Sequence, residues 1–174
     1  QMPKKYIINV IPGDGIGKEV IPIAVKVLKK LSRKFNFILE FKSFDYSCDY
    51  YIKNGSMMDK DGLKKLEDCH AILLGSVGMP SVADHISLWG LLIPIRRAFD
   101  QYVNLRPVKS LKGIDSVLRD KKNIDYLIVR ENTEGEYSDI GGIENKNQPD
   151  EFVFQKAIFS KKGTERIVNY AYEL

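Results

Sequence analysis

The chain has 174 residues, of which 44% are hydrophobic, and its 27 basic and 23 acidic residues give a formal charge of +4. This composition is globular, and because the basic residues are spread along the chain it argues against nucleic-acid binding. The longest apolar run, LWGLLIPI, is eight residues long and too short to cross a membrane, and two cysteines without CxxC spacing are typical of a reducing compartment, so we expect a cytoplasmic protein.

The first predicted unit is a strand, a glycine turn and a helix, in KYIINVIPGDGIGKEVIPIAVKVLKKL. The turn has glycines at Gly13, Gly15 and Gly17, which give GxGxG rather than the GxGxxG of dinucleotide-binding folds. We therefore favour a structural turn, with phosphate binding as the alternative. The apolar residues of the helix recur at helical spacing: Val20, Ile23, Val27 and Leu31.

The next predicted elements continue the alternation of strands and helices. A strand is expected in FNFILEFKSF, a helix near MMDKDGLKKLEDC and a strand in AILLGSVG. This alternation predicts a parallel sheet. A further helix is expected in DHISLWGLLIPIRRAFDQY, with Ser87 as its cap and a kink or broken turn at Pro94.

The composition changes near residue 100, where strand-rich sequence replaces the alternation, so we place a domain boundary between 1–100 and 101–174. The later strands are expected in YVNLRPV, DYLIVREN and EFVFQKAIFS, the last of them half-exposed, and Ser160 is expected to cap the final helix. That helix stops in the middle of its apolar pattern, so we expect the chain to be a fragment.

Three arginines, Arg96, Arg106 and Arg130, each follow an apolar run and are expected to end a packed segment. A guanidinium is costly to bury without an anion, and it binds carboxylates bidentately, so three such ends in one cavity would orient a small di- or tricarboxylate. For any single arginine the alternative is a surface position or an ion pair.

Tyr137 follows Arg130 in a segment rich in acidic residues and is a candidate proton donor. The alternative is that this segment is a solvated charged loop. His70 and His85 have no ligand partner at short helical spacing, so no metal site is expected within this chain.

Four segments resemble one family, the metal-dependent decarboxylating dehydrogenases of β-hydroxy acids, which include isocitrate and isopropylmalate dehydrogenases. The segments occur in the family's order and extend over nearly the whole chain: IPGDGIGKEV, AILLGSVGMP, LLIPIRRAFDQYVNLRPVK and IVRENTEGEYS. DHISLWG followed by FDQYVNLRPV is most similar to the tartrate and D-malate dehydrogenase branch. The resemblance implies an α/β, isopropylmalate dehydrogenase-like fold that is not a Rossmann domain, here the N-terminal portion of a two-domain subunit.

The same resemblance implies roles for individual residues. Arg96, Arg106 and Arg130 would bind the carboxylate and hydroxyl oxygens of the substrate, and Tyr137 would protonate the enol left by decarboxylation. The residues that would contact NAD near its nicotinamide end are Gly78, Met79, Trp89 and Leu92.

Substrate choice is expected to follow from two positions. The family's isocitrate enzymes carry a serine and an asparagine where this chain has Gly90 and Leu92, so the resemblance argues against isocitrate. It implies a (2R)-hydroxy diacid such as D-malate or tartrate. A second interpretation is 3-isopropylmalate dehydrogenase, which Leu92 and Ile93 permit, and a third is a non-catalytic diacid-binding or regulatory subunit.

The resemblance also implies what the chain lacks. The ligands of the Mg²⁺ or Mn²⁺ ion and the catalytic lysine are expected beyond Leu174, and the lysine is expected to cross the interface of a homodimer. Residues 1–100 would form the cofactor side, and residues 101–174 would begin the substrate and dimerisation side. The fragment alone is therefore expected to be inactive.

Overall fold

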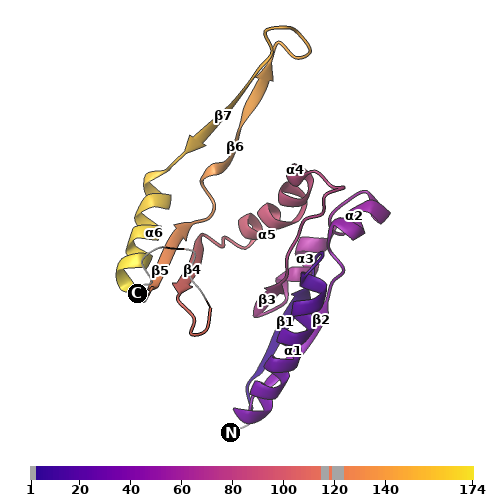
Figure 1. The fold of residues 1–174 in the computed structure, drawn as a ribbon, viewed down its shortest axis with the longest axis vertical. Coiled ribbons are helices and arrows are strands. Elements are labelled where there is room, and N and C mark those ends of the chain that lie inside the picture. The colour runs from indigo at the N-terminus through magenta and orange to yellow at the C-terminus, as the bar shows by residue number, and fades with distance from the viewer. Residues whose placement is uncertain (1–2, 115–117, 119–123) are drawn as a thin grey trace. The chain divides into compact units, whose positions relative to one another are not determined.

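The computed structural model of the chain describes residues 3–114, 118 and 124–174 (Figure 1). The chain divides into two compact units, Gln1–Phe99 and Asp100–Leu174. The cofactor and substrate roles expected for residues 1–100 and 101–174 stay predictions.

A parallel sheet organises the first unit. Its strands are β1 (Lys5–Ile11), β2 (Ile38–Ser43) and β3 (Ala71–Leu74), in the order β2-β1-β3, and β1 pairs in parallel with both neighbours. Helix α1 (Gly17–Lys34) follows β1 and contacts β2. The parallel sheet predicted from the alternation of strands and helices is confirmed.

Two short helices complete the core of this unit. They are α2 (Cys48–Asn54), which was not predicted, and α3 (Gly62–Glu67), which lies in the predicted helical segment. Ser47 caps α2, because its side chain accepts a hydrogen bond from the amide of Tyr50. The buried core residues are Ile11, Tyr46, Cys48, Met57, Leu66, Val82, Leu91 and Ile95.

The glycine turn after β1 is built by close backbone packing. Gly13 has φ of 73°, and a Cβ atom placed on it would lie 2.0 Å from the carbonyl oxygen of Ser76. A Cβ atom on Gly17 would lie 2.1 Å from the carbonyl oxygen of Pro12. The amide of Asp14 also donates a hydrogen bond to that Ser76 oxygen, at 2.6 Å. These contacts explain Gly13 and Gly17 structurally, as the favoured interpretation requires, whereas a Cβ atom on Gly15 would contact nothing and only its φ of 50° favours glycine.

The predicted helix between residues 84 and 98 is interrupted. Helix α4 (Asp84–Ser87) leads into a π-helical turn at Leu88–Leu92, which leads into α5 (Ile93–Ala98). Pro94 has no amide to donate to the preceding turn, and the wider π turn lies immediately before it. The broken turn predicted from Pro94 is confirmed.

The prediction that Ser87 caps this helix is wrong. The first residue of the helix is Asp84, three residues before Ser87, and Ala83 is at the cap position. Ser87 is buried at the end of α4, and its hydroxyl donates a hydrogen bond to the carbonyl oxygen of Asp84 at 3.1 Å. The hydroxyl therefore satisfies a carbonyl within the helix instead of the amides at its start.

The second unit contains two antiparallel strand pairs and one helix. Strand β4 (Val103–Lys109) pairs with β5 (Asp125–Glu131), and β6 (Gly135–Glu144) pairs with β7 (Phe152–Ile158). Helix α6 (Lys161–Glu173) contacts β5. Strand β6 was not predicted.

The predicted cap of the last helix is confirmed. Ser160 precedes α6, and its hydroxyl oxygen accepts a hydrogen bond from the amide of Gly163 at 2.9 Å.

Among the described residues, none of the helices combines the length and the apolar character that a membrane crossing requires.

Several apolar faces are exposed. Tyr126 of β5 is 53% exposed, and the first four residues of this strand are all exposed, so the expectation that Arg130 ends a buried strand is wrong for this chain. Both faces of β7 are exposed, although its alternation predicted one. In α1 the predicted apolar stripe is also exposed: Val20, Ile23, Val27 and Leu31.

Candidate active site

Arg130 and Tyr137, two of the predicted site residues, lie together in the second unit. The guanidinium carbon of Arg130 is 5.9 Å from the centre of the Tyr137 ring, within the range of a cation–π contact. Arg130 comes from the end of β5 and Tyr137 from the start of β6, so the turn between these strands brings them into contact. They line a pocket of about 480 Å³ with four neighbours: Glu131, Glu134, Glu136 and Phe159.

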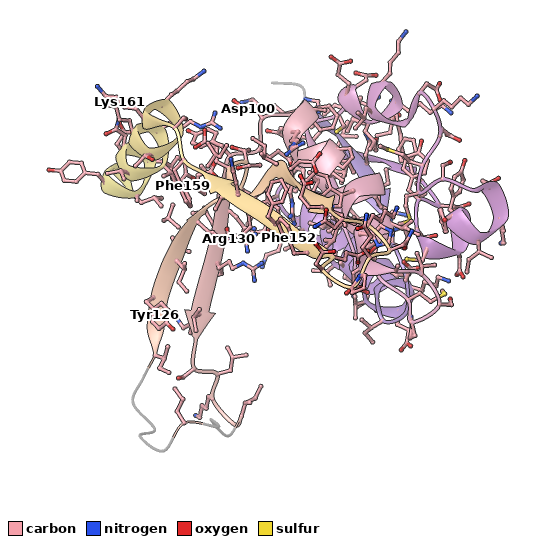
Figure 2. All side chains as sticks on the ribbon, turned by 90° about the horizontal axis from the view of Figure 1, so that it is seen from above. Asp100, Tyr126, Arg130, Phe152, Phe159 and Lys161 are labelled. Carbon is pink, nitrogen blue, oxygen red and sulfur yellow. The ribbon has the colours of Figure 1, made fainter. Side chains whose placement is uncertain are left out.

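Arg106 shares a face with Arg130. Strand pairing places Asn104 opposite Arg130 and Arg106 opposite Ile128, and residues two apart on a strand lie on the same side. The two arginines are therefore diagonal neighbours on one face of the β4–β5 ribbon, where Figure 2 shows Tyr126 toward one end and Arg130 toward the other.

The expectation that Arg106 ends its segment is wrong. It lies in the middle of β4, is exposed, and is followed by Pro107 within the strand. β4 has one partner among the described residues, and a strand with a free edge tolerates a proline because no ladder hydrogen bond is lost on that side.

One nitrogen of Arg130 is anchored and another is not. Its Nη2 donates a hydrogen bond to Oδ1 of Asn132 at 3.1 Å. Its Nε atom is buried and has no hydrogen-bond partner among the described residues. A buried N–H group without a partner is costly, so this nitrogen is an unsatisfied donor of the guanidinium.

Glu131 belongs to the fold of the turn. Its carboxylate accepts hydrogen bonds from the amides of Thr133 and Glu134, at 2.9 and 2.8 Å, and from the Thr133 hydroxyl at 2.6 Å. Burial would raise the pKa of Glu131, but these hydrogen bonds outweigh it and hold the pKa below its ordinary value. Glu131 is therefore an ionised structural residue.

Glu134 joins the same turn to the start of α6. Its carboxylate accepts hydrogen bonds from the amide of Ser160 at 2.8 Å and from the Ser160 hydroxyl at 2.5 Å. A Cβ atom on Gly163 would lie 2.4 Å from this carboxylate, so the helix approaches closely only because it has glycine there. For Glu131 and Glu134 the interpretation as a solvated charged loop is wrong.

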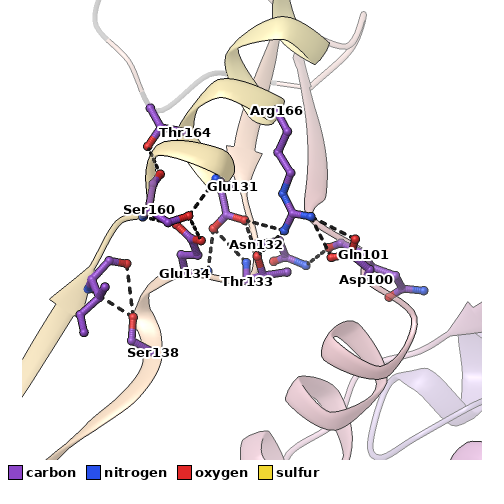
Figure 3. A network of polar contacts seen from close by, with 12 residues as sticks. Asp100, Gln101, Glu131, Asn132, Thr133, Glu134, Ser138, Ser160, Thr164 and Arg166 are labelled. Atoms are coloured by element: carbon purple, nitrogen blue, oxygen red, sulfur yellow. Dashed lines mark hydrogen bonds and ion pairs between the residues drawn. The ribbon is translucent and has the colours of Figure 1, made fainter.

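Arg166, which the sequence analysis did not single out, connects α6 to Asp100 and to the turn after β5 (Figure 3). Its Nη1 donates to both carboxylate oxygens of Asp100, each at 3.0 Å, and its Nη2 donates to the Thr133 hydroxyl at 2.9 Å. Its guanidinium also lies 4.3 Å from the centre of the Tyr102 ring. No motif marks Arg166, because its partners are distant in sequence.

The predicted cofactor residues belong to the first unit. The amide of Gly78 donates a hydrogen bond to Oδ2 of Asp14 at 3.1 Å, and Met79 forms an isolated bridge with Val82. Trp89 and Leu92 lie in the π turn, and the guanidinium of Arg97 is 5.1 Å from the Trp89 ring. A Cβ atom on Gly78 would contact nothing within 4 Å, and the NAD role of these four residues stays a prediction.

Asp14 fixes the loop that carries Gly78, and the sequence analysis missed it. This buried carboxylate accepts hydrogen bonds from the amides of Cys48, Asp49 and Gly78. Burial would raise the pKa of Asp14, but these hydrogen bonds hold it below its ordinary value. Its position between two turn glycines was the available signal, since aspartate there bonds to backbone amides.

Arg96 lies in the last turn of α5 and is half-buried. It belongs to the first unit, whereas Arg106 and Arg130 belong to the second, so the meeting of all three arginines stays a prediction.

The described residues contain no group of three or more histidine, cysteine, aspartate or glutamate side chains that could hold a metal ion. A metal would need ligands from outside these residues.

The first unit is a parallel α/β unit, and in the second unit Arg130 and Tyr137 line one pocket. The chain belongs to the isocitrate/isopropylmalate dehydrogenase family, which matches residues 7–174. The predicted fold is confirmed: an isocitrate dehydrogenase from Methylococcus capsulatus superimposes with a TM-score of 0.78 at 26% identity, over 97% of this chain and 47% of that one. A β-decarboxylating dehydrogenase from Thermococcus kodakarensis gives 0.67 at 30% identity, over 97% and 45%.

Two curated relatives are similar in sequence along nearly the whole chain. The tartrate dehydrogenase/decarboxylase of Pseudomonas putida is 48% identical over 97% of this chain and 47% of its own length. The D-malate dehydrogenase [decarboxylating] of Escherichia coli K12 is 48% identical over 99% of this chain and 49% of its own length. The chain thus spans about half the length of these relatives.

Proposed function

We propose that the complete protein is an NAD-dependent and Mg²⁺- or Mn²⁺-dependent enzyme that oxidises and decarboxylates a (2R)-hydroxy diacid such as D-malate or tartrate. The names of the two curated relatives support this substrate class. The observation that carries the proposal is the contact of Arg130 with Tyr137 at a pocket, with Arg106 on the same face of the ribbon.

We assign substrate binding to the arginines of this chain and proton donation to Tyr137. Arg106 and Arg130 bind carboxylate oxygens of the diacid, and Arg96 supplies a third cationic contact. After the substrate has lost a hydride and its hydroxyl proton, and then carbon dioxide, the electrons of the broken carbon–carbon bond form the enolate of the product. Tyr137 donates the proton that this enolate takes up at carbon to give the product.

Gly78, Met79, Trp89 and Leu92 would hold NAD, whose chemistry would be to take up the hydride. The resemblance, and no observation of this structure, assigns the metal ligands and the catalytic lysine to residues outside this chain. The roles of the arginines and of Tyr137 do not depend on this assignment. We place the protein in the cytoplasm as a homodimer, with no nucleic-acid or membrane partner.

Position 90 supports a small diacid over isocitrate. A Cβ atom on Gly90 would lie 2.7 Å from Cγ of Met57, which is buried, so a serine could enter only if Met57 moved. The isopropylmalate interpretation relies on Leu92 and Ile93, and of these Ile93 is buried among the core residues, whereas Leu92 is half-buried. The structure therefore offers less apolar surface for an isopropyl group than the sequence suggested.

Steady-state kinetics of the complete protein with NAD and Mn²⁺ test the proposal. D-malate, tartrate, 3-isopropylmalate and isocitrate are compared by kcat/KM, and one of the first two is expected to be preferred. A preference for isocitrate or isopropylmalate would contradict the substrate assignment. Diacid binding by calorimetry without NADH production would instead favour the non-catalytic subunit.

A further inference from the structure

We propose that Asn132 is a positioning residue, which holds the guanidinium of Arg130 against Tyr137 while leaving its positive charge available to the substrate. The positioning itself is a matter of geometry. Its consequence for diacid affinity rests on the proposed function.

Asn132 is 6% exposed and is fixed by four hydrogen bonds. Its backbone amide donates to the carbonyl oxygen of Tyr102 at 3.0 Å, and its side-chain Nδ2 donates to that of Gln101 at 3.1 Å. Its Oδ1 accepts from Nη2 of Arg130 at 3.1 Å and from Nδ2 of Asn104 at 3.4 Å. The side chain therefore connects β4 and the segment before it to the end of β5.

These partners determine how the amide is oriented. A guanidinium only donates and the Gln101 carbonyl only accepts, so the amide oxygen must face Arg130 and the amide nitrogen must face Gln101. The reverse orientation would set donor against donor and acceptor against acceptor. Asn132 thus supplies a rigid acceptor for one nitrogen of Arg130.

The neutrality of this acceptor matters as much as its position. An aspartate would also accept from Arg130, but it would neutralise the charge that a diacid needs and would face the Gln101 carbonyl without a proton to donate. An isosteric leucine would provide no acceptor. An amide anchors Nη2 without charge, and the buried Nε atom, which lacks a partner among the described residues, keeps a fixed direction.

The first experiment measures the position of the guanidinium without any substrate. The ring current of Tyr137 shifts the resonance of the nearby Arg130 Nε–H group, which is identified in ¹H–¹⁵N spectra of the complete protein by its loss in Arg130→Lys. Asn132→Leu is expected to move this resonance, because the guanidinium leaves the ring. An unchanged resonance would overturn the proposal whatever the activity.

The second experiment measures the consequence for binding. Asn132→Asp is expected to raise the KM for D-malate by roughly 10- to 100-fold, the worth of a charge-assisted hydrogen bond, with little change in the KM for NAD. Asn147→Asp, on an exposed turn of the same unit, is the control for added charge and is expected to leave both values unchanged. A merely structural role would instead lower the melting temperature and alter both KM values together, which would overturn the proposal.

The two experiments also separate this inference from the function itself. If the parent protein binds and oxidises no diacid but the Arg130 resonance moves in Asn132→Leu, the proposed function fails and the positioning role stands. If the parent oxidises D-malate but Asn132→Asp leaves its KM unchanged, the proposed function stands and Asn132 has no role in it.

Discussion

Each of the two units is stabilised internally by a different kind of interaction. In the first, a buried apolar cluster lies against a parallel sheet, and the buried polar residues Asn9 and Asp14 bond to backbone groups. In the second, much of the apolar surface of the strands is exposed, and a network of arginine, glutamate and hydroxyl groups ties α6 to the turn after β5 (Figure 3). The candidate catalytic residue lies in this second unit, so its geometry depends on polar contacts with strict directions.

The largest expected effect is on the apolar core of the first unit. Leu66 is fully buried, so Leu66→Ala leaves a cavity and is expected to lower the free energy of unfolding by roughly 2 to 5 kcal/mol. Phe154→Ala on exposed β7 is the comparison, and a much smaller loss is expected there. Urea denaturation measures both, and equal losses would show that the two units do not differ in this way.

An intermediate effect is expected at Arg166. Lysine keeps the charge but cannot donate to both oxygens of Asp100 and to Thr133 at once, so Arg166→Lys should destabilise the second unit by about 2 kcal/mol. Hydrogen exchange should then become faster in α6 and in the turn after β5, and stay unchanged in β1. Faster exchange in both units would mean that the polar network does not act locally.

A smaller effect, which depends on pH, is expected at Asp14. Asp14→Asn loses an ionised acceptor of three backbone amides, which is expected to cost roughly 1 to 2 kcal/mol at neutral pH. The pKa of Asp14 is below its ordinary value of 3.8 in the folded state, so its contribution is complete above that value and is lost as the pH falls through the lower, folded pKa. The stability difference between parent and variant should therefore shrink below pH 3.8. A difference that stays constant with pH would contradict the proposed ionised state.

The sequence predicted the first unit better than the second, for a physical reason. Short apolar runs predict β1 and β3, and helical periodicity predicts α1, because each of these patterns lies within one short stretch of sequence. Strand β6 has no such pattern, since it is rich in glycine and acids, and it is defined by pairing with β7 across an irregularity between Gly135 and Ile140. Pairing of this kind cannot be read from local sequence.

The candidate site was predicted in part for the same reason. Arg130 and Tyr137 were found because their segment resembles a known motif, and the structure brings them together. Arg166 was missed because Asp100 lies 66 residues away in the chain, and Asn132 was missed because its contacts with Gln101 and Asn104 join distant segments that no local pattern links to Arg130. Ser87 was misassigned because a serine before an apolar run signals a helix start only where no earlier residue begins the helix.

The most direct test of the central claim is Tyr137→Phe in the complete protein. The arginines remain, so binding of the diacid and NAD should be retained, while turnover should fall by roughly 10² to 10⁴, the usual contribution of a positioned acid.

Hydride transfer does not need the proton of Tyr137, so the deficit should lie after oxidation. Supplying the keto acid directly, with metal present, follows decarboxylation and enol protonation without hydride transfer. The variant is expected to convert the keto acid far more slowly than the parent. Conversion at the parent's rate would show that Tyr137 is not the acid.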